Sequence, residues 1–282
     1  RGLDLVARGQ AVVPQGSAPF RDLSTGEQGS YQRRFVVFMM SSDLTAMDVS
    51  GWDILKKALN QRVVVVRSSL VPSNRNRVWF VETDVRPVVV KRSLSGLSSV
   101  EFETMLLAKK AGLSVPYPLY MDRNYLVTEF ISGDSCDMLV NALFSTGAAE
   151  GIGRWLGAFH ESMESFGKPL AMSDAVLENF VMHEGEVFGV DLEDTKPGDP
   201  MDDLGQMASS ILGNEPFFTP VKFDLCFNLL EAYEQRTGIE SRESVRPYVV
   251  KHLRRSVRAR PLYRRPFEQV ARALEKGWPD LA

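Results

Sequence analysis

The chain has 282 residues and a mass of 31.6 kDa, so one large domain or two fused lobes would both fit its length. Hydrophobic residues at 44% and charged residues at 24% are ordinary globular values, which excludes a wholly disordered or fibrous chain. Lys and Arg number 33 against 36 Asp and Glu, and the formal net charge of −3 does not by itself indicate a nucleic-acid partner.

Cysteine content and hydropathy predict a cytoplasmic protein. Cys136 and Cys226 are too few for a disulfide scaffold or a zinc site, and two packed thiols suit a reducing compartment. No apolar run approaches the roughly 20 residues of a membrane span, and no charged start with an apolar core follows Arg1. We therefore expect neither a signal peptide nor a membrane partner.

Residues 1–60 are predicted to form an N-terminal extension, and residues 61–132 a strand-rich N-lobe. The extension is polar and partly irregular, with an apolar run at 35–40 and one short helix over 50–59, which begins with capping-box spacing. Runs rich in β-branched residues predict strands at 62–71, 78–83, 87–92 and 125–131. Helical spacing predicts one long helix at 100–111, which ends before Gly112.

Residues 133–282 are predicted to form a mainly helical C-lobe, whose last helices are basic. Apolar residues at helical spacing predict helices at 152–163, 201–212, 220–236, 245–258 and 266–276. A small hairpin is expected within 171–190, with Glu184 and Gly185 as its turn. Two lobes joined near residues 131–134 would leave a cleft between them.

A lysine at the end of an apolar strand is the first candidate for chemistry. Lys91 follows three valines, and Arg92 beside it would point to the opposite face of the sheet. Such a lysine is usually a solvated strand end, but phosphoryl transfer needs positive charge on the nucleotide phosphates. The next helix offers Glu101 and Glu103, either of which could hold the ammonium group, although most helix-face glutamates are surface residues.

Three oxygen-bearing side chains around the predicted hairpin form the second candidate. Asn179 follows Asp174 by five residues, and Asp191 comes at the end of the second strand. Together they would bring three oxygen ligands to one edge, which suits a hard cation such as Mg²⁺. The alternative is a loop that uses Asp and Asn for turns and caps, and these residues alone do not decide between the two.

The combination resembles the protein-kinase-like superfamily. The resemblance covers residues 62 to 212. The motifs in this range are most similar to those of the aminoglycoside and choline phosphotransferases, and the RIO-type and KEOPS-associated small kinases are near relatives of the same fold. The most specific segment, at 194–204, reads DTKPGDPMDDL and is similar to the phosphotransferase pattern of GDP followed by DL. The resemblance implies an α+β bilobal protein-kinase-like fold, with an antiparallel-sheet N-lobe carrying one long helix and a mainly helical C-lobe.

The resemblance also implies roles for individual residues. Lys91 would bind the phosphates of ATP, with Glu103 as its partner, and Asp174 would be the catalytic aspartate. Asn179 and Asp191 would bind Mg²⁺. The remaining nucleotide contacts would come from the hinge and from the turn over the phosphates, namely Glu129, Phe130, Ile131, Ser73 and Asn74.

Two departures from the family pattern concern the catalytic loop and the phosphate-covering turn. Met172 stands where the family has His two residues before the catalytic aspartate, and Ser173 stands in the usual Gly place. Because that histidine mainly supports the loop, its loss affects the expected loop geometry more than the chemistry. The turn over the phosphates lacks glycine, so its contacts would come from side chains.

The C-terminal segment is basic. Residues 246–276 contain ten Lys and Arg against Glu268 and Glu275. Such a run is ordinarily a solvated helical face. The alternative is a binding site for a polyanionic acceptor, with RNA as the first candidate. Arg254, Arg255 and Arg258 are the candidate acceptor-binding residues.

The sequence therefore predicts an ATP- and Mg²⁺-dependent phosphotransferase that acts on an acceptor hydroxyl. The short distance between Asp191 and Asp203 leaves no room for the peptide platform of ordinary Ser/Thr kinases. The acceptor is a small molecule, an RNA or one dedicated protein. The alternative is a catalytically inactive nucleotide-binding pseudokinase with a regulatory role.

Overall fold

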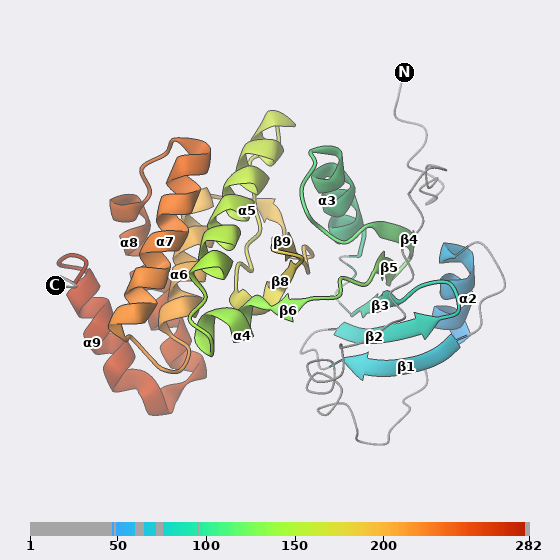
Figure 1. Cartoon of the computed structure of the whole chain (residues 1–282), viewed down its shortest axis with the longest axis horizontal. Coiled ribbons are helices and arrows are strands. Elements are labelled where there is room, and N and C mark those ends of the chain that lie inside the picture. The colour runs from blue at the N-terminus through green and yellow to red at the C-terminus, as the bar shows by residue number, and fades with distance from the viewer. Residues whose placement is uncertain are drawn as a thin grey trace. The chain divides into compact units, whose positions relative to one another are not determined.

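The chain folds into two compact units (Figure 1). The computed structural model describes residues 47, 49–59, 65–71, 76–94, 96 and 98–279, and for 65–71 the backbone only. The apolar run at 35–40 and the candidate residues Ser73 and Asn74 lie outside this range. The first unit contains the described residues up to Ser99 together with Pro118–Phe130, and the second contains Val100–Tyr117 and the chain from Ile131 onward.

The first unit is a five-stranded antiparallel sheet with one helix packed on it. The strand order is β1-β2-β3-β5-β4. Its elements are α2 (Val49–Ala58), β1 (Val65–Val71), β2 (Asn76–Thr83), β3 (Val88–Ser93), β4 (Pro118–Asp122) and β5 (Tyr125–Glu129). The helix packs against β3, β4 and β5, so the short helix predicted for the extension belongs to this unit.

Alternation along the strands places a group of buried apolar side chains on one face of the sheet. Val88 and Val90 on β3 are buried, as is Val127 on β5, which lies opposite Val90 in the register. A Cβ atom at Gly51 of α2 would lie 3.3 Å from the Tyr125 ring, so the helix approaches this face closely. Lys91 therefore points to the other face, since neighbouring residues in a strand alternate.

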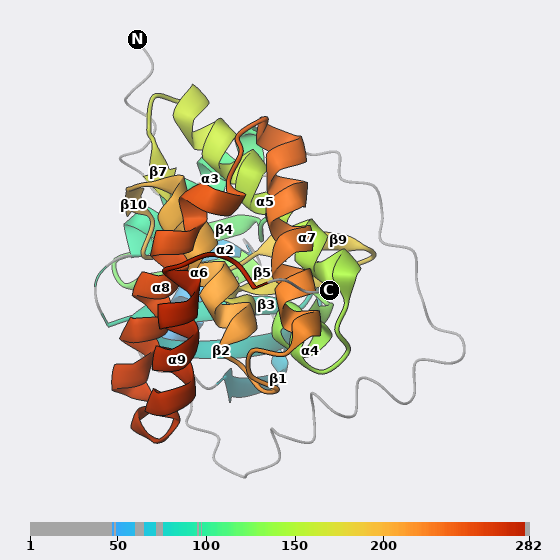
Figure 2. The ribbon, with the colours of Figure 1, turned by 90° about the vertical axis from the view of Figure 1, so that its left-hand side faces the viewer.

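The second unit is mainly helical and contains two small sheets (Figure 2). Its helices are α3 (Ser98–Lys110, which belongs to this unit from Val100), α4 (Cys136–Asn141), α5 (Thr146–Ser165), η2 (Leu177–Asn179), α6 (Pro200–Leu212), α7 (Pro220–Thr237), α8 (Arg242–Ala259), η3 (Pro261–Tyr263) and α9 (Arg264–Leu274). Its strands are β6 (Asp134–Ser135), β7 (Leu170–Ala171), β8 (Phe180–His183), β9 (Glu186–Gly189) and β10 (Lys196–Pro197). The sheet orders are β6-β8-β9 and β10-β7.

Local sequence signals explain where several of these elements begin and end. Gly112 has a φ of 81°, the left-handed conformation that ends α3 as predicted. His183 pairs with Glu186, so Glu184 and Gly185 form the two-residue turn of the β8–β9 hairpin, also as predicted. The helices expected at 152–163, 201–212, 220–236, 245–258 and 266–276 are all present, whereas α4 was not predicted.

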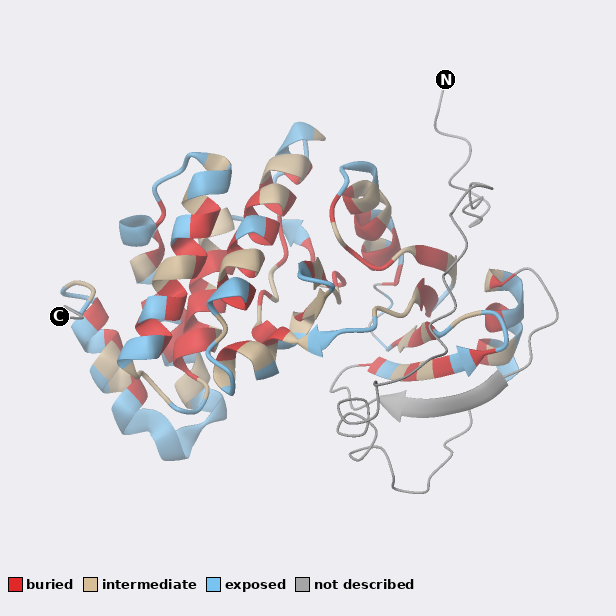
Figure 3. Ribbon diagram, viewed as in Figure 1, coloured by how far each residue is buried: buried red, intermediate tan, exposed pale blue. Residues whose placement is uncertain are grey.

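The core of the second unit lies between its long helices, whose facing residues are buried (Figure 3). α5 packs chiefly against α7, and α6 packs against α8. At the first of these contacts a Cβ on Gly153 would lie 2.1 Å from the carbonyl oxygen of Leu229. Only glycine permits this approach, because the obstacle is backbone and cannot rotate away. Among the described helices, none combines the length and apolar character needed to cross a membrane.

The close approach at Gly153 predicts a sharp loss of stability on substitution. Gly153→Ala should lower the free energy of unfolding by about 1–3 kcal/mol, because α5 and α7 must separate to admit the methyl group. The matched control is Gly147→Ala in the first turn of α5, where a Cβ would meet nothing within 4 Å. That change should be neutral or slightly stabilising. Urea denaturation of both variants measures the difference, and equal effects would contradict the packing described here.

Candidate active site

One buried carboxylate holds the loop that contains Asp174. Asp203, the fourth residue of α6, is 1% exposed. Its Oδ1 accepts a hydrogen bond from the backbone N of Ser173 at 2.8 Å. Its Oδ2 accepts one from the backbone N of Met172 and lies 3.0 Å from Nε2 of His160 on α5. Three donors therefore converge on one carboxylate, which satisfies a charge that would be costly to bury alone.

The histidine in this cluster joins α5 and α7 to the loop. His160 Nδ1 lies 3.2 Å from the hydroxyl of Tyr233 on α7. A proton on Nε2 would be donated to Asp203 and leave Nδ1 to accept from the tyrosine, which satisfies both ring nitrogens. Burial, followed by the charge of Asp203, raises the pKa of Tyr233 to about 12, so its hydroxyl keeps its proton.

The departure at Met172 does not remove the support of the loop. The Met172 side chain is fully buried, while the loop is held through backbone N–H groups that any residue would provide. Ser173 has a φ of 63°, a left-handed conformation that is unfavourable for a residue with a Cβ. Glycine would adopt it freely, and here the contact with Asp203 stabilises it.

Asp174 receives a side-chain amide on each carboxylate oxygen. Gln206 Nε2 donates to Oδ1 at 3.2 Å, and Asn179 Nδ2 lies 3.4 Å from Oδ2 and 2.9 Å from the carbonyl oxygen of Asp174. Hydrogen bonds to a carboxylate favour its charged form and fix its orientation. Gln206 was not predicted from the sequence. Its signal is its spacing of three residues from Asp203, which places both on one face of α6.

Asp191 lies among carboxylates rather than at the end of a strand. It follows β9 by two residues and has a φ of 61°. The backbone N of the preceding Val190 donates to the carbonyl oxygen of Asn179 at 2.9 Å, which ties this segment to the loop after Asp174. The carboxylate oxygens of Glu101, Asp191 and Glu193 all lie within 4.8 Å of one another.

The glutamate of α3 in this cluster is Glu101. It is 3% exposed, whereas Glu103, which the family resemblance indicates, is exposed to solvent. Carboxylates this close are stabilised by positive charge, either a cation with oxygen ligands or a basic side chain. The cluster therefore favours Glu101 over Glu103 and adds Glu193 to the candidate residues.

The candidate nucleotide residues of the first unit lie on or just after its central strands. Lys91 is 7% exposed and pairs in register with Val78 on β2 and Leu126 on β5. Arg92 projects to the other face, where its guanidinium carbon lies 5.7 Å from the centre of the Tyr125 ring. Among the hinge candidates, Glu129 ends β5, the Phe130 ring packs 4.6 Å from that of Phe80, and Ile131 begins the second unit.

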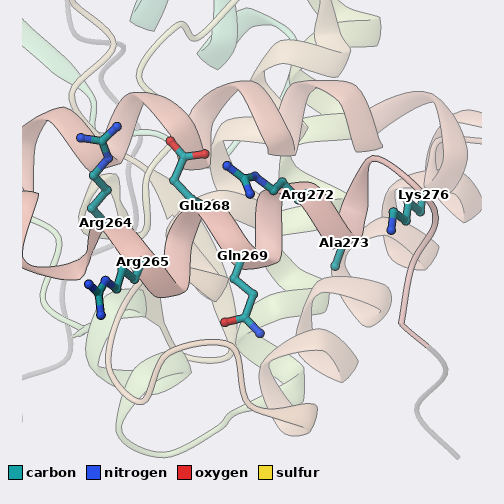
Figure 4. A pocket seen from close by; sticks show the side chains of 7 residues that line it. All are labelled: Arg264, Arg265, Glu268, Gln269, Arg272, Ala273 and Lys276. Carbon is teal, nitrogen blue, oxygen red and sulfur yellow. The ribbon is translucent and has the colours of Figure 1, made fainter.

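The basic C-terminal segment does not form one uniform patch. Arg254 of α8 is paired with Glu275 at 2.8 Å and with Glu268 at 4.0 Å, both near α9. Arg255 instead lines a cavity beside α6, and Arg258 is exposed. Figure 4 shows a separate open hollow along α9, with a volume of about 630 Å³. It is lined by Arg264, Arg265, Glu268, Gln269, Arg272, Ala273 and Lys276.

The fold is that of the protein-kinase-like phosphotransferases. No family model and no curated protein matches the chain. A Ralstonia eutropha structure assigned as an aminoglycoside phosphotransferase has 14% identity and a TM-score of 0.58 over 82% of this chain and 99% of its own. Plasmodium vivax ethanolamine kinase has 9% identity and a TM-score of 0.55 over 83% and 88%.

A third structure of this fold is amicoumacin kinase hAmiN in complex with AMP-PNP, Ca²⁺ and Ami. It has 13% identity and a TM-score of 0.55 over 66% of this chain and 78% of its own. At such low identity these structures show the fold alone. They confirm the predicted α+β architecture, with an antiparallel-sheet part followed by a helical part.

The role of Asp203 in holding the loop can be tested against its neighbour in the same helix. Asp203→Asn should lower the free energy of unfolding by about 1–3 kcal/mol, because an amide nitrogen cannot accept from Met172 or Ser173. Hydrogen exchange of these two backbone amides should accelerate.

The matched control is Asp202→Asn, one residue earlier. Burial alone would raise the pKa of Asp202, but hydrogen bonds from Lys251 at 2.8 Å and His252 at 2.7 Å leave it below its ordinary value. Asp202 and Lys251 lie near the surface, so the change should leave the hydrogen exchange of the Met172 and Ser173 backbone amides unaltered. Equal acceleration in both variants would contradict the proposed support of the loop.

Proposed function

We propose that the protein is an ATP- and Mg²⁺-dependent phosphotransferase that transfers the γ-phosphate to an acceptor hydroxyl. The observation that favours this proposal most directly is that helix α6 holds the loop that contains Asp174. α6 holds Met172 and Ser173 through Asp203, and it orients the carboxylate of Asp174 through Gln206. A carboxylate positioned in this way is the group that phosphoryl transfer to a hydroxyl requires.

In this proposal Asp174 is the catalytic residue. The acceptor oxygen bonds to the γ-phosphorus while the bond from that phosphorus to the β–γ bridging oxygen breaks, and ADP leaves. The proton of the acceptor hydroxyl passes to the Asp174 carboxylate and then to solvent. Gln206 and Asn179 orient the two carboxylate oxygens, so one of them faces the acceptor without reorganisation of the loop.

The donor set around Asp191 fits a hard divalent cation. Asn179 and Asp191 would hold Mg²⁺, and Glu193 adds a third oxygen-bearing side chain close to Asp191. The ion would supply charge neutralisation on the transferred phosphate when bound. The left-handed backbone at Asp191 directs its carboxylate toward the other two of the cluster, Glu101 and Glu193.

The first unit would bind the nucleotide. Lys91 would bind the phosphates, the backbone at Glu129–Ile131 would bind adenine, and Ser73 and Asn74 would cover the phosphates. As the functional glutamate of α3 we propose Glu101 in place of Glu103, because Glu101 is buried beside Asp191 and Glu103 is exposed. A cytoplasmic location fits the two buried free cysteines, and burial raises the pKa of the Cys136 thiol to about 12.

Substitutions at the two aspartates should separate catalysis from metal binding. Asp174→Ala should lower turnover by about 10²-fold or more with little change in ATP affinity, because its role is in the transition state. Asp191→Ala should instead weaken Mg²⁺-dependent ATP binding as well as turnover. ADP release and calorimetric ATP titration measure both. Mg²⁺-dependent ATP binding without any ADP release in the wild type would favour the pseudokinase alternative.

The glutamate of α3 provides a second test, with a control two residues away. Glu101→Gln should reduce ADP release as Lys91→Met does, whereas Glu103→Gln should leave it unchanged because that side chain is exposed. Thermal unfolding of all three variants checks that the fold is retained. Loss of activity in Glu103→Gln with normal activity in Glu101→Gln would reverse the assignment.

A further inference from the structure

A cavity of about 270 Å³ opens between α6 and α8, beside the loop that contains Asp174. Its lining residues are Val176, Glu178, Gln206, Ser209, Ser210, Gly213, Asn214, His252, Arg255, Ser256, Ala259 and Arg260. Gln206 both lines the cavity and donates to Oδ1 of Asp174 at 3.2 Å. The cavity therefore begins one side chain away from the proposed catalytic carboxylate.

Arg255 carries a positive charge that the surrounding protein does not neutralise. It forms no ion pair or hydrogen bond with any residue that the structure describes, although it lines the cavity. The preceding Arg254 is different, because two glutamates pair with it on the other side of α8. An unpaired guanidinium at a cavity is a binding group for a carboxylate or phosphate.

The second guanidinium of the cavity is fixed in place and partly neutralised. Arg260 donates to the carbonyl oxygen of Gly213 and, at 3.0 Å, to Oδ1 of Asn214, so its orientation is set by the end of α6. Desolvation raises the pKa of Glu178, the charges of Asp137 and Asp174 raise it further, and a backbone hydrogen bond and Arg260 oppose the rise. Arg260 is therefore fixed by the end of α6 and lies near an acidic residue, whereas Arg255 has neither restraint.

The other titratable group of the cavity adds no positive charge near neutral pH. Burial lowers the pKa of His252, while its Nε2 lies 2.7 Å from Asp202, which also pairs with Lys251. The residues that line the cavity therefore have one formal positive charge in excess, from two arginines and one glutamate. Its remaining polar side chains, Gln206 and the serines, suit hydroxyl groups.

The volume limits the size of the occupant. Pockets for drug-sized ligands begin at roughly 300 Å³, and this cavity of about 270 Å³ is smaller. A folded RNA or a protein could place only one group inside it. Glu178 is the single acidic residue in its lining, beside two arginines, so a polycation would find little to bind.

We infer that this cavity receives the phosphate acceptor, and that the acceptor is a small hydroxyl compound with an anionic group. The anionic group binds Arg255, and a hydroxyl of the same molecule reaches Asp174 past Gln206. This inference rests on the proposed function and adds the class of acceptor. It also distinguishes the acceptor site at Arg255 from the basic face of α9, where a long polyanion such as RNA would bind.

The test uses the whole 282-residue chain with AMP-PNP, Mg²⁺ and compounds of similar size that differ in charge. The probes are glycerate against glycerol, and glucuronate against glucose and glucosamine, together with unfractionated tRNA. Calorimetric titration should show binding of the acids and not of the neutral or amino compounds. ADP release with ATP should rise for at least one acid.

Variants of neighbouring arginines give the matched control. Arg255→Gln should weaken binding of the acid by about tenfold or more, since a charged hydrogen-bonded pair is lost, and should leave ATP affinity unchanged. Arg254→Gln should leave acid binding unchanged, because that side chain is paired toward α9. Thermal unfolding shows whether each variant is folded.

Three outcomes would overturn the inference. These are the absence of binding by any acid at millimolar concentration, preference for the neutral or amino compounds, and equal binding of the acid by Arg255→Gln and the wild type. Binding of tRNA alone would move the acceptor site to α9. Failure of the proposed function looks different, because the wild type would then neither bind ATP with Mg²⁺ nor release ADP with any acceptor.

Discussion

The buried carboxylate of Asp203 is the interaction on which the rest of the candidate site depends. A buried charge is stable only when donors surround it, and here the donors come from His160 and from the backbone of Met172 and Ser173. α5, α6 and the loop are therefore held in one arrangement. Because the loop is held by its backbone, the methionine at position 172 does not weaken that support, and Asp174 follows immediately from a fixed position.

α6 contacts the loop that contains Asp174 with one face and lines the proposed acceptor cavity with the next. Asp203 and Gln206 face the loop, whereas Asp202 pairs with Lys251 and His252 of α8. The cavity lies where these faces meet, and Gln206 of α6 both lines it and donates to Asp174. One helix therefore contacts the proposed catalytic carboxylate and forms part of the proposed acceptor cavity, an arrangement that suits transfer to a bound hydroxyl.

Local patterns predicted the secondary structure better than the orientation of single side chains. The hairpin turn at Glu184 and the alternation of Lys91 and Arg92 follow from turn chemistry and from the two-residue period of a strand. The choice between Glu101 and Glu103 did not follow, although they lie about 200° apart on a helix. Apolar residues occur on several sides of α3, so the sequence does not show which side is buried.

The sequence by itself determined the order of most elements, because strands, turns and helices depend on short-range patterns, and its resemblance to known phosphotransferases singled out Lys91, Asp174, Asn179 and Asp191 as candidates. Only the tertiary structure decided which distant groups meet. Gln206 reaches Asp174 across 32 positions, and Arg255 lines the same cavity from another helix. Such meetings depend on how α6 and α8 are rotated against each other and on the left-handed backbone at Ser173 and Asp191. The spacing of residues in the sequence predicts neither the rotation of packed helices nor a strained loop conformation.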